Sequence, residues 1–183
     1  MATKTAYPFR VEPQEVDFSL RITLVALGGN ILNIAGIDAH TKGFGVDALN
    51  KDNFSWVLSR IAFEFDYRPE EYVKYEIATW NFELTDQTGV CFGRVVSQWC
   101  MLDLSKRTAV DLRAVAESHN DAIVECPSPA EKPRKVPAPD AEPVLTHKVA
   151  YSDIDFNRHV NTMRYIEMML DVLPVSYTHL RAH

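Results

Sequence analysis

Residues 23–41 have the sequence TLVALGGNILNIAGIDAHT, and this stretch decides the fold. Thr23 can cap a helix, and apolar residues then recur at three- and four-residue spacing, as on one face of a helix. These apolar residues are Leu24, Leu27, Ile31, Ile34 and Ile37. Gly43 and Gly45 follow as helix breakers, so we predict one long helix that ends near Thr41.

The predicted helix contains three glycines, Gly28, Gly29 and Gly36. Each of them lowers the helix propensity by about 1 kcal/mol relative to alanine. Glycines kept at this cost often let another backbone approach closely, as when a sheet wraps around a helix. We therefore expect close packing against this helix.

Three segments with strand character follow the helix. Residues 53–65 are rich in aromatic and branched side chains, residues 72–84 alternate, and residues 90–104 are again rich in Val, Trp and Met. The sequence DQTG at 86–89 predicts a hairpin turn between the second and third segments. One long helix followed by long antiparallel strands indicates an α+β unit in which a curved sheet wraps around a buried helix.

A proline-rich segment divides the chain. Residues 126–143 hold six of the ten prolines, which predicts a semi-rigid linker after a first domain at 1–125. Residues 144–174 then repeat the order of strand and helix, with a strand expected over 144–151 and a helix over 159–173. This second unit is close to the lower size limit for an independent core, so it either packs on the first domain or is incomplete.

The composition excludes some classes of protein. A formal net charge of −6 argues against a nucleic-acid-binding protein, which would usually carry a basic field. No apolar run approaches the ~20 residues of a membrane helix, and the N-terminal residues lack the apolar core of a secretory signal, so we expect a cytoplasmic protein. Cys91, Cys100 and Cys126 fit neither an even disulfide framework nor a CxxC metal motif, and we expect free thiols.

Polar side chains gather in residues 153–159, DIDFNRH, directly before the second predicted helix. His159 could transfer protons, and Asp155 could orient it or accept a proton from water. Asn157 could cap the helix or hold a substrate carbonyl, while the amides of the first helical turn stabilise the oxyanion of an ester or thioester. A plain capping loop with an exposed histidine is the alternative interpretation that spacing alone leaves open.

Metal and nucleotide sites are poorly supported. The D-x-D-x-N pattern does not make a calcium loop, because Arg158 stands where glycine is needed and Arg164 where glutamate is needed. One histidine without a second ligand at helical spacing does not make a zinc site. No GxSxG, phosphate-loop or dinucleotide glycine motif occurs, and we expect no cofactor and no metal.

The sequence SDIDFNRHVN at 152–161, continued by YIE at 165–167, resembles the active-site motif in the second domain of acyl-acyl carrier protein thioesterases. Three further matches, TLVALG at 23–28, GFG at 43–45 and WVLSR at 56–60, resemble the first domain of that family in the same order. The resemblance implies two hot-dog domains in tandem, each an antiparallel sheet wrapped on one long helix. In this chain the first would be complete and the second truncated.

The resemblance also implies an activity, the hydrolysis of a fatty acyl thioester that releases free fatty acid from the carrier protein. The catalytic positions of the family motif fall on Asp155, Asn157 and His159. The family supplies a further acidic or thiol catalytic residue from later strands, and we can assign no residue to that role. We therefore expect this chain to be an inactive fragment, of the bacterial rather than the plastid type.

Two details depart from the family pattern. Met168 stands where the family usually has tryptophan, and residues 175–183 match nothing expected. That last segment resembles translated adapter read-through, and we treat it as a non-native tail.

An acyl carrier protein would be the partner, and it is acidic as a class. Basic candidates for docking are Lys132, Arg134, Lys135, Arg158 and Arg164. A coenzyme A thioesterase, another hot-dog enzyme such as a dehydratase, and a non-enzymatic acyl-binding module are the alternatives. An apolar stripe along Met163, Ile166 and Leu170 predicts self-association, including a homodimer.

Overall fold

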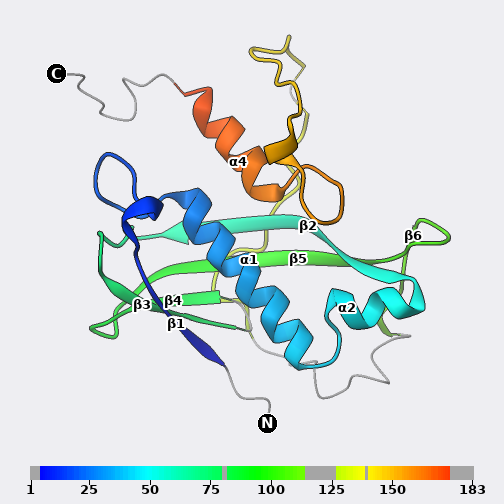
Figure 1. Cartoon of the computed structure of the whole chain (residues 1–183), viewed down its shortest axis with the longest axis horizontal. Coiled ribbons are helices and arrows are strands. Elements are labelled where there is room, and N and C mark those ends of the chain that lie inside the picture. The colour runs from blue at the N-terminus through cyan, green and yellow to red at the C-terminus, as the bar shows by residue number, and fades with distance from the viewer. Residues whose placement is uncertain (1–4, 80–81, 114–126, 139, 174–183) are drawn as a thin grey trace.

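The long helix α1 (Leu24–Thr41) lies against one face of a curved antiparallel sheet (Figure 1). This computed structural model describes residues 5–79, 82–113, 127–138 and 140–173. The Oγ1 atom of Thr23 accepts a hydrogen bond from the Ala26 amide at 3.1 Å, which caps the first turn as predicted. The helix ends at Thr41, also as predicted, and Gly43 adopts a positive φ of 79° directly after it.

In the described residues the sheet has six strands, with β1, β3, β4, β5 and β2 side by side in that order. The short strand β6 pairs with β5. The strands are β1 (Ala6–Arg10), β2 (Phe54–Phe65), β3 (Lys74–Ala78), β4 (Phe82–Asp86), β5 (Cys91–Asp103) and β6 (Thr108–Ala109). The hairpin turn predicted at 86–89 joins β4 and β5, and every pairing is antiparallel.

One strand prediction was wrong. Residues 72–84 do not form a single strand but two, β3 and β4, which pair with each other so that Ile77 lies opposite Leu84. No glycine or proline stands between these two strands to mark a turn. The alternating pattern therefore runs through the chain reversal, and the sequence shows one strand where the structure has two.

The core lies between α1 and the sheet. The buried residues of the helix face include Leu27, Ile31 and Ile34, at the predicted helical spacing. They pack in one cluster with buried side chains of the strands, among them Tyr75, Ile77, Leu84, Phe92 and Val95. Burying each large apolar side chain contributes about 1.5–3 kcal/mol, so this cluster stabilises the packing of the sheet on the helix.

The other elements whose bounds the described residues give are short. The helix α2 (Val46–Leu49) follows α1, and single-turn 3-10 helices in the described residues lie at Pro13–Glu15, Asn50–Asp52 and Tyr151–Asp153. The described part of the predicted linker, 127–138 and 140–143, contains neither helix nor strand. The predicted boundary between first domain and linker, together with Cys126 and the segment 175–183, lies outside the described residues.

The strand expected over 144–151 was also wrong. Residues 144–150 form neither helix nor strand, and Tyr151 begins a 3-10 helix. Val144, Leu145 and Val149 are all exposed. In the described part of the chain no strand lies beside them to complete a ladder, and β-branched residues without a partner do not make a strand.

The last helix, α4 (Thr162–Asp171), packs on α1 near β2 (Figure 1). Met163 of α4 is buried, and a Cβ atom added to Gly28 would lie 2.5 Å from its Sδ atom. Gly28 therefore provides the expected close approach, mainly to Met163 of α4, while Phe63 of β2 lies at 3.4 Å from the same position. An added Cβ at Gly29 or Gly36 would meet nothing within 4 Å.

Candidate active site

The residues between the last 3-10 helix and α4 form a tight loop at 154–161. Ile154 and Val160 pair as an isolated antiparallel bridge, and the Asp155 amide donates to the His159 carbonyl at 2.8 Å. The Arg158 amide donates to the Asp155 carbonyl at 3.0 Å, and Arg158 adopts a positive φ of 63° at the turn. The loop is therefore a small hairpin with defined backbone geometry.

All three predicted site residues lie on this loop. The half-buried Asp155 accepts hydrogen bonds through Oδ1 from the amides of Asn157, at 2.8 Å, and His159, at 3.2 Å. The side chains of Asn157 and His159 are exposed. The structure thus brings the three residues together through the Asp155 carboxylate and two backbone amides, and it leaves the imidazole accessible to solvent.

The prediction that Asn157 caps the helix was wrong. The cap is Asn161, whose Oδ1 accepts from the Met163 amide at 2.8 Å, and α4 begins at Thr162 rather than at 159. The cause is the hairpin, which returns the chain on itself before the helix can start. The Met163 and Arg164 amides both bond to Asn161, so in the first turn of α4 these two donors are not available to an oxyanion.

Asp153 is a residue whose role the sequence did not indicate. Its side chain is 1% exposed and accepts hydrogen bonds from His147 Nε2 at 2.8 Å, the Ala150 amide at 2.6 Å and Arg164 Nε at 3.2 Å. The hydrogen bond from His147, followed by that from Ala150, lowers the pKa of Asp153 to about 2. The available signal was its place three residues after Ala150, the spacing at which a side chain turns back to cap a helical turn.

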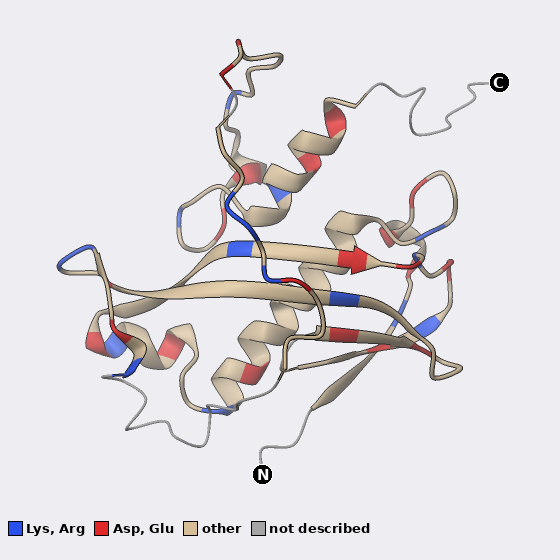
Figure 2. Ribbon diagram, turned by 180° about the vertical axis from the view of Figure 1, so that it is seen from behind, with Lys and Arg blue, Asp and Glu red and all other residues tan. Residues whose placement is uncertain are grey.

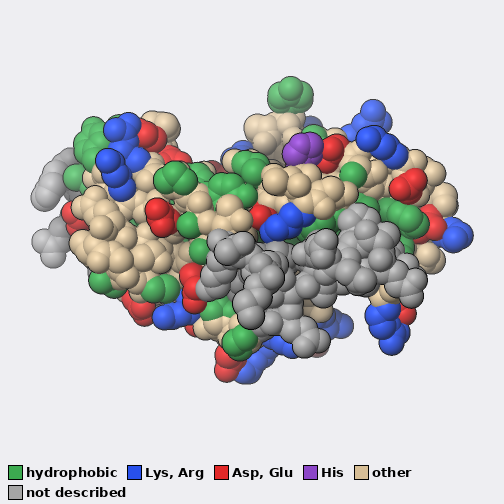
Figure 3. Space-filling view, turned by 90° about the horizontal axis from the view of Figure 1, so that it is seen from below, with side chains coloured by type: hydrophobic (Ala, Val, Ile, Leu, Met, Phe, Trp, Pro, Cys, Tyr) green, Lys and Arg blue, Asp and Glu red, His purple; other side chains and the backbone are tan. Residues whose placement is uncertain are grey.

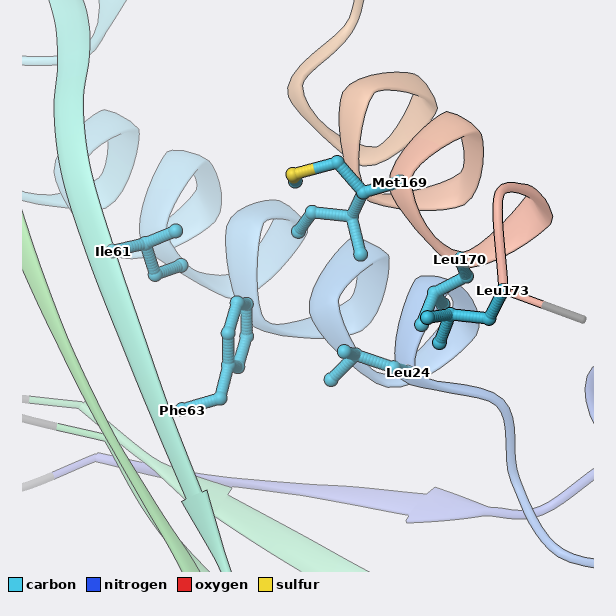
Figure 4. Close-up of a pocket in the computed structure, with 7 residues that line it drawn as sticks. Leu24, Ile61, Phe63, Met169, Leu170 and Leu173 are labelled. Atoms are coloured by element: carbon cyan, nitrogen blue, oxygen red, sulfur yellow. The ribbon is translucent and has the colours of Figure 1, made fainter. Parts of the chain in front are cut away.

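An apolar hollow of about 460 Å³ lies between α1, β2 and α4 (Figure 4). Its walls are Leu24, Ile61, Phe63, Ile166, Met169, Leu170 and Leu173. None of the three predicted site residues lines it. The stripe predicted to be exposed is exposed only in part, because Met163 is buried and Ile166 half-buried, while Leu170 is 41% exposed.

Charges are dispersed over the described surface. Acidic and basic residues occur on most of the elements and loops in Figure 2, and in Figure 3 they alternate with apolar side chains. Arg164 pairs with both Asp153 and Glu167, and Arg134 pairs with Glu131, so these two docking candidates have partners within the chain.

Within the described ranges, no group of three or more His, Cys, Asp and Glu side chains could hold a metal ion. Over the same residues, none of the helices is both long and apolar enough to cross a membrane. Cys91 and Cys100 are free and half-buried. The hydrogen-bonded loop at 154–161 offers an imidazole, a carboxylate and a carboxamide, which is a set suited to general acid–base chemistry.

Comparisons with known proteins identify the class. Residues 138–182 match the model of the acyl-ACP thioesterase C-terminal domain. The chain is 26% identical over 196 residues to oleoyl-acyl carrier protein thioesterase 2, chloroplastic, of Arabidopsis thaliana, covering 91% of this chain and 53% of that protein. It thus spans about half the length of the curated relatives it matches.

Solved structures agree with this class. A 12:0-ACP thioesterase from Umbellularia californica shares the fold with a TM-score of 0.77 at 20% identity, over 94% of this chain and 76% of that one. The sheet wrapped on α1 is accordingly a hot-dog fold. An acyl-ACP thioesterase from Bacteroides thetaiotaomicron is 39% identical with a TM-score of 0.87, over 96% of this chain and 76% of that one. The chain belongs to the acyl-ACP thioesterase family.

Proposed function

We propose that the whole protein hydrolyses fatty acyl-acyl carrier protein thioesters to free fatty acid. The observation that carries the proposal is the hairpin loop at 154–161, which presents Asp155, Asn157 and His159 within a chain 39% identical to a bacterial acyl-ACP thioesterase. Family membership supplies the class of reaction, and the loop supplies the groups that such a reaction requires.

Each group has a role that its surroundings support. The exposed imidazole of His159 accepts a proton from water, and the resulting hydroxide attacks the thioester carbonyl carbon. The carbon–sulfur bond then breaks, and the leaving thiolate takes the proton back from the imidazolium. Asn157 donates its carboxamide N–H to the carbonyl oxygen as negative charge develops there. Asp155 positions Asn157 and His159, because its Oδ1 atom accepts hydrogen bonds from the backbone N–H groups of both residues.

The division of the chain is also a proposal. We propose a first hot-dog domain at 1–125, a linker at 126–143 and the start of a second hot-dog domain at 144–174. The family match reaches residue 182 and so includes most of the segment 175–183. Packing of α4 on α1 supports a second unit whose apolar side chains are buried against the first domain rather than in a core of its own.

Thiol release from a series of acyl-acyl carrier proteins, catalysed by the whole protein, tests the function. We expect His159→Ala to lower kcat by about 100-fold or more, the usual loss when a general base is removed, and Asp155→Ala to lower it as well. His40→Ala, which removes an exposed histidine at the end of α1, is the matched control and should leave kcat unchanged. Wild-type rates in both His159→Ala and Asp155→Ala would sink the assignment of these residues.

The same assay with coenzyme A thioesters separates the second candidate function. Faster turnover of coenzyme A thioesters than of carrier-bound ones would favour an acyl-coenzyme A thioesterase, a hot-dog activity that the fold also accommodates. Binding of a fatty acid without any turnover would instead favour an acyl-binding module.

Docking of the acidic carrier protein should use exposed basic residues near the loop. Arg158 is exposed on the loop itself, and Lys132 and Lys135 are exposed in the linker. We expect KM for the carrier-bound substrate to rise with salt, because added ions screen attraction between exposed charges. An unchanged KM across salt concentrations would contradict electrostatic docking. We further propose a cytoplasmic location, on the match to a bacterial family member.

A further inference from the structure

The buried carboxylate of Asp153 is hydrogen-bonded on both of its oxygens. Oδ2 accepts from His147 and from the Ala150 amide, and Oδ1 accepts from Arg164. At 1% exposure the side chain cannot exchange these partners for water. A buried charge of this kind is stable only while its partners stay in place, so the cluster constrains everything attached to it.

The three partners of Asp153 come from two different segments. His147 and Ala150 belong to the irregular segment before the loop, while Arg164 belongs to the first turn of α4. The backbone adds a fourth link, since the Asn161 amide donates to the Asp153 carbonyl at 2.8 Å. Asp153 directly precedes the first arm of the hairpin loop, and Asn161 ends the second arm, so this hydrogen bond closes the base of the loop.

We propose that Asp153 is a positioning residue, which through His147 and Arg164 holds the loop bearing Asp155, Asn157 and His159 against the start of α4. This inference rests on the proposed function for its catalytic meaning. The two carboxylates have separate tasks: Asp155 shapes the interior of the loop, and Asp153 fixes the loop to the rest of the molecule.

Replacement of Asp153 by asparagine isolates the charge. Asn has nearly the same shape, but its NH₂ group would face a donor, either the Ala150 amide or the Arg164 guanidinium. At least one of the three hydrogen bonds is then lost. The arms of the loop should open more often, while α1, which supplies none of these three hydrogen bonds to Asp153, should be unaffected.

Amide hydrogen exchange on the full chain tests this without relying on activity. In Asp153→Asn we expect the amides of Asn157, His159 and Asn161 to exchange on the order of tenfold faster, as for loss of one charge-assisted hydrogen bond. Amides in the middle of α1 should exchange at the wild-type rate. Asp171→Asn, the same change at an exposed position of α4, is the matched control and should alter neither set.

Two results would overturn the proposal. Equal acceleration in the loop and in α1 would show a general loss of stability, and unchanged exchange in the loop would show that Asp153 holds nothing there. If Asp153→Asn fails to fold, His147→Gln and His147→Ala replace it. Glutamine keeps an N–H donor and should retain the protection of the loop, while alanine should lose it; equal behaviour of the two variants would refute the inference.

Kinetics add a second readout. In protein that hydrolyses acyl thioesters, Asp153→Asn should lower kcat by about tenfold and leave KM nearly unchanged, because misplacement of the loop affects the transition state more than binding. A rise in KM with constant kcat would contradict positioning. Absence of hydrolysis by the wild type would refute the proposed function alone, since hydrogen exchange would still decide the role of Asp153.

Discussion

Gly28 and Gly29 are neighbours on α1 with different surroundings. A Cβ at Gly29 meets nothing within 4 Å, so Gly29→Ala should raise the free energy of unfolding by about 1 kcal/mol through helix propensity. A Cβ at Gly28 would lie 2.5 Å from Met163 Sδ, so in Gly28→Ala the same gain should be cancelled by displacement of α4. Urea denaturation of the two variants measures the difference.

The pair also has an internal control. In a Met163→Ala background the obstacle at Gly28 is absent, and Gly28→Ala should then stabilise the protein as much as Gly29→Ala does. Equal stabilisation by both substitutions in the wild-type background would mean that α4 does not press on α1 at this point.

Stability at acid pH depends in part on Asp153. Its pKa in the folded protein is about 2, below the ordinary value of 3.8, because His147 and the Ala150 amide bond to the charged form. Unfolded chains therefore bind the proton first as the pH falls. The contribution of Asp153 to stability is complete above about pH 3.8 and is lost as the pH falls towards about 2.

We expect Asp153→Asn to be less stable than the wild type at neutral pH and to lose less stability on acidification. Urea midpoints measured across the acid range test this. Asp86 and Asp103 also have lowered pKa values, each mainly through a hydrogen bond from a neighbouring side chain, so acid sensitivity should be reduced rather than abolished. An unchanged slope against pH would contradict the prediction.

At the scale of elements, the start of α4 distinguishes two asparagines. Asn161 caps the helix and Asn157 does not, so Asn161→Ala should lower the free energy of unfolding by about 1 kcal/mol. Asn157→Ala, at an exposed loop position, should change it by less than about 0.5 kcal/mol while impairing hydrolysis. Chemical denaturation and thiol release, measured on both variants, separate a structural from a catalytic asparagine. A larger loss of stability in Asn157→Ala would reverse these roles.

The elements that sequence analysis predicted correctly are those specified by nearby residues. The spacing of Leu27, Ile31 and Ile34 predicts α1 without further information, and the sequence DQTG at 86–89 predicts the hairpin turn between β4 and β5. A strand also needs a neighbour, which its own residues do not specify, and so the strand expected over 144–151 was wrong.

The candidate site shows the same distinction. The residues at 153–159 predicted a polar loop before a helix, and that loop is present. The bonds that Asp153 makes to His147 and Arg164 depend on how three segments fold together, and no periodicity connects those positions. The helix cap moved from Asn157 to Asn161 because the hairpin between them is held by backbone contacts that side-chain patterns do not reveal.

At the scale of the whole molecule, α4 leaves apolar side chains uncovered. Met169 is 63% exposed and Leu173 50% exposed at the rim of the hollow shared with α1 and β2. We expect the chain to self-associate through this surface, and Met169→Glu to weaken the association by placing a charge in it. Sedimentation velocity over a range of concentrations measures the effect.

The control substitutes an apolar residue exposed elsewhere. Val136, in the linker, is 86% exposed, and Val136→Glu adds the same charge away from the hollow. It should leave self-association unchanged. A monomer at all concentrations, or equal effects of the two substitutions, would show that this surface does not mediate association.

The order of strands has a consequence for synthesis on the ribosome. β2 pairs along its length with β5, which comes later in the chain. The side chains that bury α1 come in part from β3, β4 and β5, and all three of these strands follow both α1 and β2 in the sequence. At about 5–20 residues per second, translation needs several seconds to reach the end of β5 after β2 is complete. Throughout that interval the nascent polypeptide displays a bare apolar helix and an unpaired strand, which makes it a natural client for a ribosome-bound chaperone.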